Sequence, residues 1–327
     1  PDDKTIKEIN ERSKMQEEIV SAFTQDIYET SDLEFRVNVG SNEEINSFDH
    51  PFLNSIGLFR SEFIYLDRSS IPTTEEQKTI LENIQKKFSG TIVYRTLDIG
   101  GDKQVDYLDL PQEENPFLGV RGIRLSLDKK ELFETQIESI LISKNVERVK
   151  IMFPMISTIE DFLESNQIVE TIADKLKINK PEVGIMIETP ASTLLIEEFS
   201  KYVDFFSIGT NDLTQYIMAA DRGNPNLVKY QDPLHPAVLR TLENVISTAN
   251  KNNIEVSVCG EMSSDSISAS ALYALGLRIF SMSPSSAPFV FQQLNKIKDM
   301  DLNKIKNNIL ALENSTEVRE ELKKLNL

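Results

Sequence analysis

The 327-residue sequence has one cysteine, two histidines and no tryptophan. A single cysteine cannot form a disulfide within the chain, which fits a reducing compartment, and one cysteine with two histidines offers no ligand cluster for zinc. No apolar run approaches the roughly 20 residues that a membrane-spanning helix needs. We therefore expect a cytoplasmic protein with no zinc site and no membrane contact.

Positive charge is also scarce. Against 52 acidic side chains there are 35 lysines and arginines, so the formal net charge is −17. This excess of negative charge repels nucleic acid and anionic lipid, and we expect neither as a partner. An anionic substrate must then meet locally placed arginines or a metal ion. Because 40% of the residues are hydrophobic, the chain can bury a sizeable core and is not expected to be disordered.

Short apolar runs alternate with helical patterns from about residue 35 onward. Most of these runs are continuous and rich in Val, Ile and Phe, which is typical of strands buried on both faces of a parallel sheet. They lie at 35–40, 55–60, 91–98, 149–155, 183–188, 205–210 and 254–260, with a weaker candidate at 118–125. Alternating strands and helices imply βαβ units. Eight units close a barrel and seven leave an open sheet. Taking 118–125 as the eighth strand, we predict a (β/α)8 TIM-type barrel.

The flanks of this region have helical spacing. A charged helix is expected at 3–29, either on the surface or as a connector to another domain, and one or two short helices are expected outside the fold at 300–327. We divide the chain into a helical linker at 1–30 and a barrel at 31–327. Inside the barrel, Ser157-x-x-Glu160 is interpreted as a capping box that starts a helix.

Reactive side chains recur where the expected strands end. Active sites of (β/α)8 barrels are built at the C-terminal ends of the strands, so this convergence predicts a site there. The side chains are Arg60, Arg95, Glu188, Asn211, Asp212 and Cys259, joined by Arg222 from the loop that follows 205–210.

The three arginines would suit a clamp for phosphate or carboxylate, because a guanidinium group bonds paired oxygens and keeps its charge. The alternative is a set of surface or salt-bridging arginines. Glu188 and Asp212 supply hard oxygen ligands that favour Mg²⁺ or Mn²⁺. Here the alternative is a pair of carboxylates bridged to the same arginines.

Cys259, in the stretch VSVCGEM, has two interpretations. A lone cysteine after a buried strand is commonly a small inert side chain. Its place at the mouth of the barrel also allows a thiol that gives or takes a proton on carbon. His50 and His235 lie in proline-containing loops, and both are interpreted as structural.

Eight stretches follow one another in a specific order: GLFRSEFIYLDR, RTLDIGGDK, NPFLGVRGIR, MFPMIST, GIMIETPAS, FFSIGTNDLTQY, DRGN and CGEM. In this order they closely resemble the phosphoenolpyruvate-binding barrel of enzyme I of the bacterial phosphoenolpyruvate:sugar phosphotransferase system. The resemblance covers residues from about 35 to 290. Ser61 stands where that family usually has threonine, so the hydroxyl is kept.

The resemblance implies a role for each of the side chains above. It implies that the phosphate of phosphoenolpyruvate is held by Arg60, Arg95 and Arg222, with further substrate contacts from Asn211 and Asp212. It also implies that Glu188 and Asp212 bind Mg²⁺, and that Cys259 protonates the enolate carbon as pyruvate forms.

Enzyme I passes the phosphoryl group to a histidine on an N-terminal swivelling domain, and from there to a histidine phosphocarrier protein. This sequence lacks the threonine–serine–histidine motif of that domain. The resemblance therefore implies a homodimeric barrel that binds phosphoenolpyruvate and Mg²⁺ without complete turnover by itself. One alternative is a non-catalytic phosphoenolpyruvate sensor, although a sensor would be expected to lose Cys259 or a metal carboxylate. Another is a Mg²⁺-dependent lyase of the citryl-CoA or malyl-CoA type, whose thioester fits an arginine clamp less well.

Overall fold

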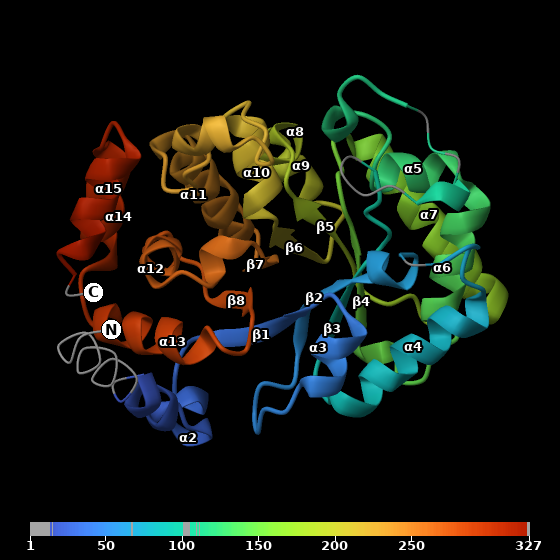
Figure 1. The fold of residues 1–327 in the computed structure, drawn as a ribbon, viewed down its shortest axis with the longest axis horizontal. Helices are drawn as coiled ribbons and strands as arrows, with labels where there is room; N and C mark the ends of the chain where they lie inside the picture. Colours follow the sequence, from blue (N-terminus) through green and yellow to red (C-terminus); the bar gives the residue numbers. More distant parts are fainter. Residues whose placement is uncertain are drawn as a thin grey trace, which may run out of the picture.

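The computed structural model describes residues 14, 16–66, 68–100, 105–108, 110 and 112–325. Eight parallel strands pair in sequence order and close into a barrel (Figure 1). This confirms the predicted (β/α)8 architecture. The strands are β1 Glu34–Val39, β2 Ile56–Arg60, β3 Ile92–Arg95, β4 Val149–Phe153, β5 Val183–Ile187, β6 Phe205–Ile208, β7 Glu255–Val258 and β8 Ile279–Met282.

The eighth strand is not the one expected from the sequence, and the assignment of 118–125 was wrong. That stretch runs from the end of a 3-10 turn, Pro116–Leu118, into helix α5, Ile123–Asp128. Between the two, Gly122 has a φ of +56°, a left-handed conformation that interrupts an extended run. The barrel closes instead through β8, which pairs with both β7 and β1.

Helices cover the outside of the barrel, with α4 to α7 on one side and α11 to α13 on the other (Figure 1). The longer ones are α4 Thr74–Lys87, α6 Lys130–Leu141, α7 Ile159–Leu176, α11 Pro236–Lys251, α12 Ser266–Ala274 and α13 Ala287–Ile297. The shorter ones are α2 Gln25–Glu29, α3 Asn42–Ser47, α8 Pro190–Leu194, α9 Ile196–Phe199 and α10 Thr210–Ile217. The expected C-terminal helices are confirmed as α14 Leu302–Ala311 and α15 Ser315–Lys323, which contact α12.

The capping box of α7 lies one residue later than the sequence analysis placed it. Thr158 is the N-cap: its hydroxyl accepts from the Asp161 backbone N–H at 3.1 Å, and the Asp161 carboxylate accepts from the Thr158 N–H at 3.2 Å. Ser157 instead remains in the preceding turn, where its hydroxyl donates to the Met155 carbonyl at 3.4 Å.

Part of the helix expected at 3–29 lies outside the described residues, which leave out 1–13 and 15. In the described part, residues 16–22 are helical, the helix is interrupted at Phe23 and Thr24, and α2 begins at Gln25. The interruption turns Phe23 into the core, where its ring lies 5.0 Å from Phe52 and 5.1 Å from Phe291. The division at residue 30 stays a prediction.

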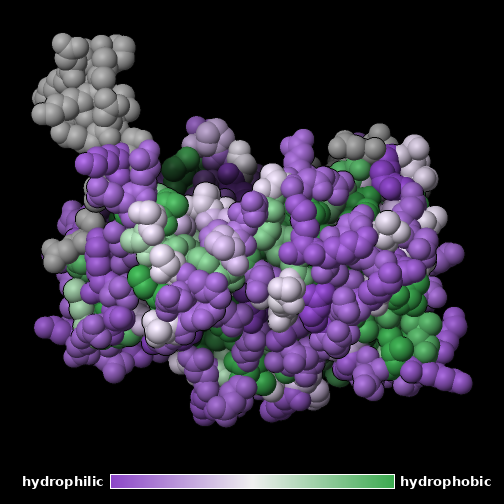
Figure 2. Space-filling model, turned by 90° about the horizontal axis from the view of Figure 1, so that it is seen from below, coloured by the Kyte–Doolittle hydropathy of each residue, from purple (hydrophilic) through white to green (hydrophobic). Residues whose placement is uncertain are grey.

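The face of the molecule in Figure 2 is covered mostly by hydrophilic residues, with apolar residues in small groups between them. This agrees with the large net charge of the sequence. Of the helices that the structure describes, none is both long enough and apolar enough to span a bilayer.

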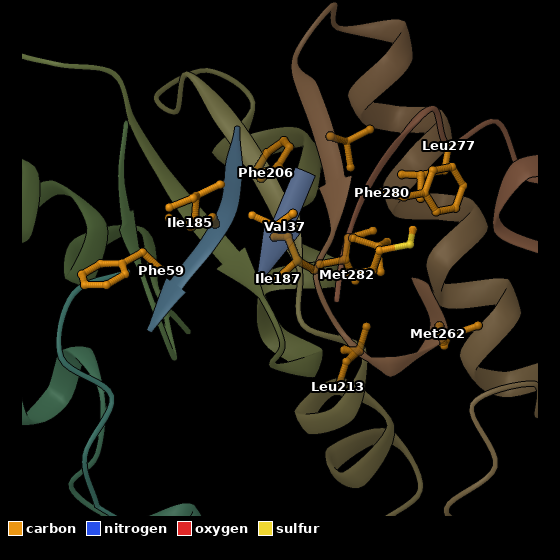
Figure 3. Packing of buried hydrophobic residues seen from close by; sticks show 14 of the residues in the cluster. Val37, Phe59, Ile185, Ile187, Phe206, Leu213, Met262, Leu277, Phe280 and Met282 are labelled. Carbon is orange, nitrogen blue, oxygen red and sulfur yellow. The ribbon is translucent and has the colours of Figure 1, made fainter. Parts of the chain in front are cut away.

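The strands are buried on both faces, as predicted. Side chains on their outward faces pack with the helices in the main core, part of which is seen in Figure 3 around Ile185, Ile187 and Phe206. Because successive side chains of a strand point to opposite faces, the intervening residues fill the barrel interior. They form a smaller, separate cluster of Leu58, Val93, Met152, Met186, Phe205 and Cys259.

An ionic layer lies inside the barrel near the N-terminal ends of the strands. Arg36 of β1 is 3% exposed and bonds Glu255 of β7 at 2.9 and 3.1 Å. Lys150 of β4 reaches the same carboxylate at 3.1 Å, and its ammonium group lies 5.3 Å from the centroid of the Phe205 ring. Burial of Glu255 disfavours its charge, but the hydrogen bonds and charges of Arg36 and Lys150 outweigh this and lower the pKa of the carboxyl. These contacts link strands that are not neighbours, so they brace the barrel across its interior.

Arg36→Met is expected to lower the free energy of unfolding by about 3 kcal/mol at neutral pH, because it removes the buried partner of Glu255. The lowered pKa of Glu255 means that the contribution is present above the ordinary pKa of a glutamate and is lost as the pH falls through the lowered value. The difference between the two proteins should therefore shrink in acid. Chemical denaturation of both proteins at neutral pH and in acid measures this difference in the free energy of unfolding.

Lys251→Met is the control for this experiment. Lys251 forms an exposed ion pair with Glu197 at 3.7 Å, and its loss should change stability by less than about 0.5 kcal/mol. If Arg36→Met were as stable as the parent protein, the ionic layer would not brace the barrel.

Candidate active site

A cavity of about 320 Å³ opens at the C-terminal ends of the barrel strands. It brings together all the site residues that the sequence analysis proposed. Those lining side chains are Arg60, Arg95, Glu188, Asn211, Asp212, Arg222 and Cys259.

Four of these residues sit where the strand pattern placed them. Arg60 and Arg95 are the last residues of β2 and β3. Glu188 and Cys259 directly follow β5 and β7. In a parallel barrel the C-terminal strand ends share one rim, which is why residues so distant in the sequence meet.

Asn211 and Asp212 are not at a strand end, as the sequence analysis had placed them. Strand β6 ends at Ile208, and both residues belong to the first turn of α10. The positive end of the helix dipole favours a carboxylate at Asp212. Asn211 is fixed by a reciprocal pair of bonds, because its amide donates to the Glu261 carboxylate and accepts from the Glu261 backbone N–H, both at 3.1 Å.

A buried charge network lies under the cavity, and the sequence analysis assigned no role to most of it. Asp98, 3% exposed, accepts from Arg121 at 3.1 Å and lies 3.1 Å from Nη1 of Arg95. Arg121 also donates to Asp212 at 3.3 Å, and Arg95 pairs with Glu62. Asp98 and Arg121 lie in two of the stretches that carry the family resemblance, RTLDIGGDK and NPFLGVRGIR. The resemblance could therefore have marked both residues as part of the site. Arg121 was overlooked because residues 118–125 were assigned to a strand.

Arg60 and Arg222 are more open than Arg95. The Arg222 guanidinium is 3.6 Å from Asp212 Oδ1, and that of Arg60 is 4.0 Å from Glu44, with side chains 37% and 44% exposed. Such long, solvated pairs are weak and leave the guanidinium donors available to a ligand. Gly40 makes room for one of them, since a Cβ at that position would come within 2.5 Å of Arg60 Nε. The expected alternative, salt-bridged arginines, thus describes Arg95 better than the other two.

Glu188 and Asp212 bring two interacting carboxyl groups to the wall of the cavity. Oε1 of Glu188 accepts from the Met155 N–H at 2.6 Å, and burial together with the charges of Asp212 and Asp98 raises its pKa well above the usual range. Within the described residues, Oδ1 of the buried Asp212 side chain has no hydrogen-bond donor. Repelling carboxylates with an unsatisfied oxygen fit a hard divalent cation.

No group of three or more His, Cys, Asp or Glu side chains is arranged to hold a metal ion in the part of the chain that the structure describes. A cation at Glu188 and Asp212 would therefore need oxygen atoms of a ligand or of water to complete its coordination. This is the usual manner of Mg²⁺, which takes one or two protein carboxylates and keeps other ligands from substrate and solvent.

Cys259 is 6% exposed and closes the apolar interior of the barrel towards the cavity. Its sulfur accepts from the Ser207 hydroxyl at 3.3 Å, and its carbonyl accepts from the Asn38 amide at 3.0 Å. Burial raises the pKa of the thiol to about 11. The group is therefore protonated at neutral pH and has a proton to give.

The two histidines are structural, as the sequence analysis proposed. Nδ1 of His50 accepts from the Leu53 N–H at 3.1 Å, and Nδ1 of His235 accepts from the Ala237 N–H at 3.2 Å at the start of α11. Each ring thereby fixes the backbone of its own loop.

Known proteins resemble this chain over most of its length. Residues 14–299 match the family described as PEP-utilising enzyme, PEP-binding domain. A phosphoenolpyruvate-protein phosphotransferase of Bacillus subtilis is 41% identical over 298 residues, covering 88% of this chain and 51% of that protein. A protein of the same name from Mycoplasma capricolum is 40% identical over 287 residues, covering 86% and 50%. The chain thus spans about half the length of the curated relatives it matches.

Among solved structures, a citrate lyase from Burkholderia xenovorans superposes with a TM-score of 0.51 and covers 90% of both chains. The two sequences are 13% identical, so this likeness concerns the barrel fold alone.

The raised pKa of Cys259 predicts slow alkylation that keeps accelerating in alkali. In the folded protein, labelling by iodoacetamide should rise about tenfold per pH unit between about pH 8 and 10, whereas in the denatured chain it should level off above about pH 9. Restricted access would slow labelling at every pH without moving the midpoint. Mass spectrometry of the single thiol follows both. A common plateau in folded and denatured protein would contradict the raised pKa.

Proposed function

Because this chain belongs to the PEP-utilising enzymes and has their PEP-binding domain, we propose that it is the phosphoenolpyruvate-binding barrel of a phosphoenolpyruvate-protein phosphotransferase. The observation that carries the proposal is the cavity, where arginines, two carboxylates and a protonated thiol meet on one rim. Relatives named for that activity are about 40% identical to this chain over most of its length.

In the proposed reaction the phosphoryl group leaves the enol oxygen of phosphoenolpyruvate. The P–O bond breaks and a bond from phosphorus to a histidine nitrogen forms. The electron pair of the broken bond stays on the enol oxygen, which gives the enolate of pyruvate. His50 and His235 are engaged in their own loops. The acceptor is proposed to be a histidine of an N-terminal domain that lies outside these 327 residues and exchanges phosphoryl groups with a histidine phosphocarrier protein.

The arginines would bind the phosphate. Arg60 and Arg222 hold their present carboxylate partners only loosely and can turn their donors towards an anion. Arg95 is held by Glu62 and Asp98, so its contribution is a fixed positive charge at the cavity floor. Asn211, held by Glu261, would present a polar contact from the first turn of α10.

Glu188 and Asp212 would hold a Mg²⁺ ion, whose chemistry is to neutralise charge on the phosphate and carboxylate oxygens of the substrate. Asp212 is fixed for this role by Arg121, and Glu188 by the Met155 N–H. Cys259 would then donate its proton to the methylene carbon of the enolate, which becomes the methyl group of pyruvate. Water in the cavity would restore the proton on sulfur.

The proposal extends to a homodimer and a cytoplasmic location. In such a dimer, exposed apolar side chains such as Leu118, Leu194 and Val228, which are 65%, 81% and 63% exposed, would be available to an interface.

Isothermal titration with phosphoenolpyruvate, with and without Mg²⁺, tests the substrate and the metal. The parent protein should bind the substrate more tightly with Mg²⁺. Glu188→Gln and Asp212→Asn should lose about 100-fold or more of that affinity, since each removes one of two protein ligands. Glu182→Gln is the matched control, because this carboxylate precedes the same strand at the opposite end of the barrel and pairs with Lys150 at 2.7 Å. Unchanged Mg²⁺ dependence in both site variants would place the metal elsewhere.

Cys259→Ala tests the proton donor in an experiment that needs no phosphoryl acceptor. By the reverse reaction, the thiolate form of Cys259 takes a proton from the methyl group of bound pyruvate, the resulting thiol exchanges that proton for a deuteron of D₂O, and the deuteron is returned to the enolate carbon. Proton NMR with Mg²⁺ should show this exchange slowed by about 10²–10⁴-fold in the variant, with phosphoenolpyruvate affinity nearly unchanged. A parent protein that binds but never exchanges would favour a sensor. If Cys259→Ala exchanged deuterium into pyruvate at the parental rate, Cys259 would not be the proton donor and would only pack against the barrel interior.

A further inference from the structure

The thiol of Cys259 contacts a hydroxyl for which the proposed reaction has so far given no purpose. Ser207 Oγ donates to Cys259 Sγ at 3.3 Å, and the thiol in turn points to the Ile208 carbonyl at 3.6 Å. Ser207 is fully buried in β6, and Cys259 directly follows the neighbouring β7. The sulfur therefore lies between a donor and an acceptor supplied by the adjacent strand.

Other buried serines at this level of the barrel bond differently. Ser257 pairs in register with Ser207 between β6 and β7, yet its hydroxyl donates to the Phe206 carbonyl at 3.4 Å. The hydroxyl of Ser281 donates to the Asn38 side chain at 2.6 Å. Buried hydroxyls most often bond to backbone or to other oxygen atoms, so the hydrogen bond from Ser207 to a sulfur is unusual.

When Cys259 loses its proton, its contact with the Ile208 carbonyl becomes unfavourable and its contact with the Ser207 hydroxyl becomes stronger. A thiolate has no hydrogen for the Ile208 carbonyl, so that contact becomes repulsive, whereas the Ser207 hydroxyl then donates to a full negative charge. Hydrogen bonds to an ionised acceptor are about twice as strong as neutral ones. The serine consequently stabilises the thiolate more than the thiol, which is the differential interaction that lowers a barrier.

We infer that Ser207 is a positioning residue for Cys259, holding the sulfur at the cavity wall and stabilising the thiolate left when its proton moves to the substrate carbon. The inference rests on the proposed function, because only a proton-donating thiol passes through this state. In that step the S–H bond breaks, a C–H bond forms with the electron pair of the enolate, and the charge stays on sulfur until solvent returns a proton.

Among the described residues, the charged groups that face the sulfur include Arg95 from β3, Glu188 from the end of β5 and Arg60 from β2. The arginines favour the thiolate and the glutamate opposes it. A change at Ser207 leaves all three in place, so its effect can be separated from theirs.

The first measurement needs neither substrate nor metal. In Ser207→Ala, alkylation of Cys259 at a fixed pH near 9 should slow by about threefold. The thiolate fraction falls about tenfold, and the greater nucleophilicity of the more basic sulfur partly compensates. Ser257→Ala removes a buried hydroxyl from the facing position on β7 and should label at the parental rate. Equal labelling of Ser207→Ala and parent, or equal slowing in both alanine variants, would overturn the inference.

The second measurement is deuterium exchange into pyruvate with Mg²⁺. Ser207→Ala should slow exchange by about tenfold while phosphoenolpyruvate affinity stays parental, and Ser207→Thr, which keeps the hydroxyl, should recover it. If Ser207→Ala exchanged deuterium into pyruvate at the parental rate while Cys259→Ala had lost exchange, the role of Ser207 would be overturned and the proposed role of Cys259 would stand. If the parent protein exchanges nothing, the proposed function fails and the positioning role falls with it.

Discussion

Asp98 lies between two buried arginines, and the floor of the cavity depends on this one carboxylate. Arg95 and Arg121 both approach it to 3.1 Å, and Arg121 continues to Asp212. Buried charges of one sign are tolerated only when they are paired, so the three groups hold one another in place. Through them the end of β3, the turn at Gly122 and the first turn of α10 become one unit. Asp212, which is proposed to bind the metal, is thus held from below by buried contacts of the protein itself.

The barrel interior has three levels with different chemistry. Arg36, Lys150 and Glu255 form an ionic layer near one end, a small apolar cluster fills the middle, and arginines and carboxylates line the cavity at the other end. Cys259 belongs to the apolar cluster and also to the cavity wall. That double position explains the raised pKa of its thiol, because the apolar cluster removes water from the sulfur although the residue lines the cavity.

Much of this arrangement could be predicted from the sequence, and the exceptions have physical causes. Long buried strands of a parallel sheet are conspicuous as continuous apolar runs, and the side chains after them had to meet on one rim. Strand β8 offers no such run, because its apolar residues are interrupted by Ser281 and are followed at once by Ser283 and Pro284. The contact between Asp98 and Arg121 depends on the left-handed turn at Gly122, which periodicity does not reveal. Asn211 and Asp212 were assigned to the right rim but the wrong element, because a residue past a strand can also begin a helix.

The fixed position of the sulfur has a stereochemical consequence. Cys259 is held by Ser207 at its side chain and by Asn38 at its carbonyl, so it approaches the cavity from one wall. A planar enolate bound by the arginines above would present one of its two faces to that wall. In the proposed reaction, a methylene group that carries deuterium and tritium in one defined geometry would therefore gain its proton on one face and become a chiral methyl group of a single handedness, the configuration being dictated by which wall of the barrel carries the thiol.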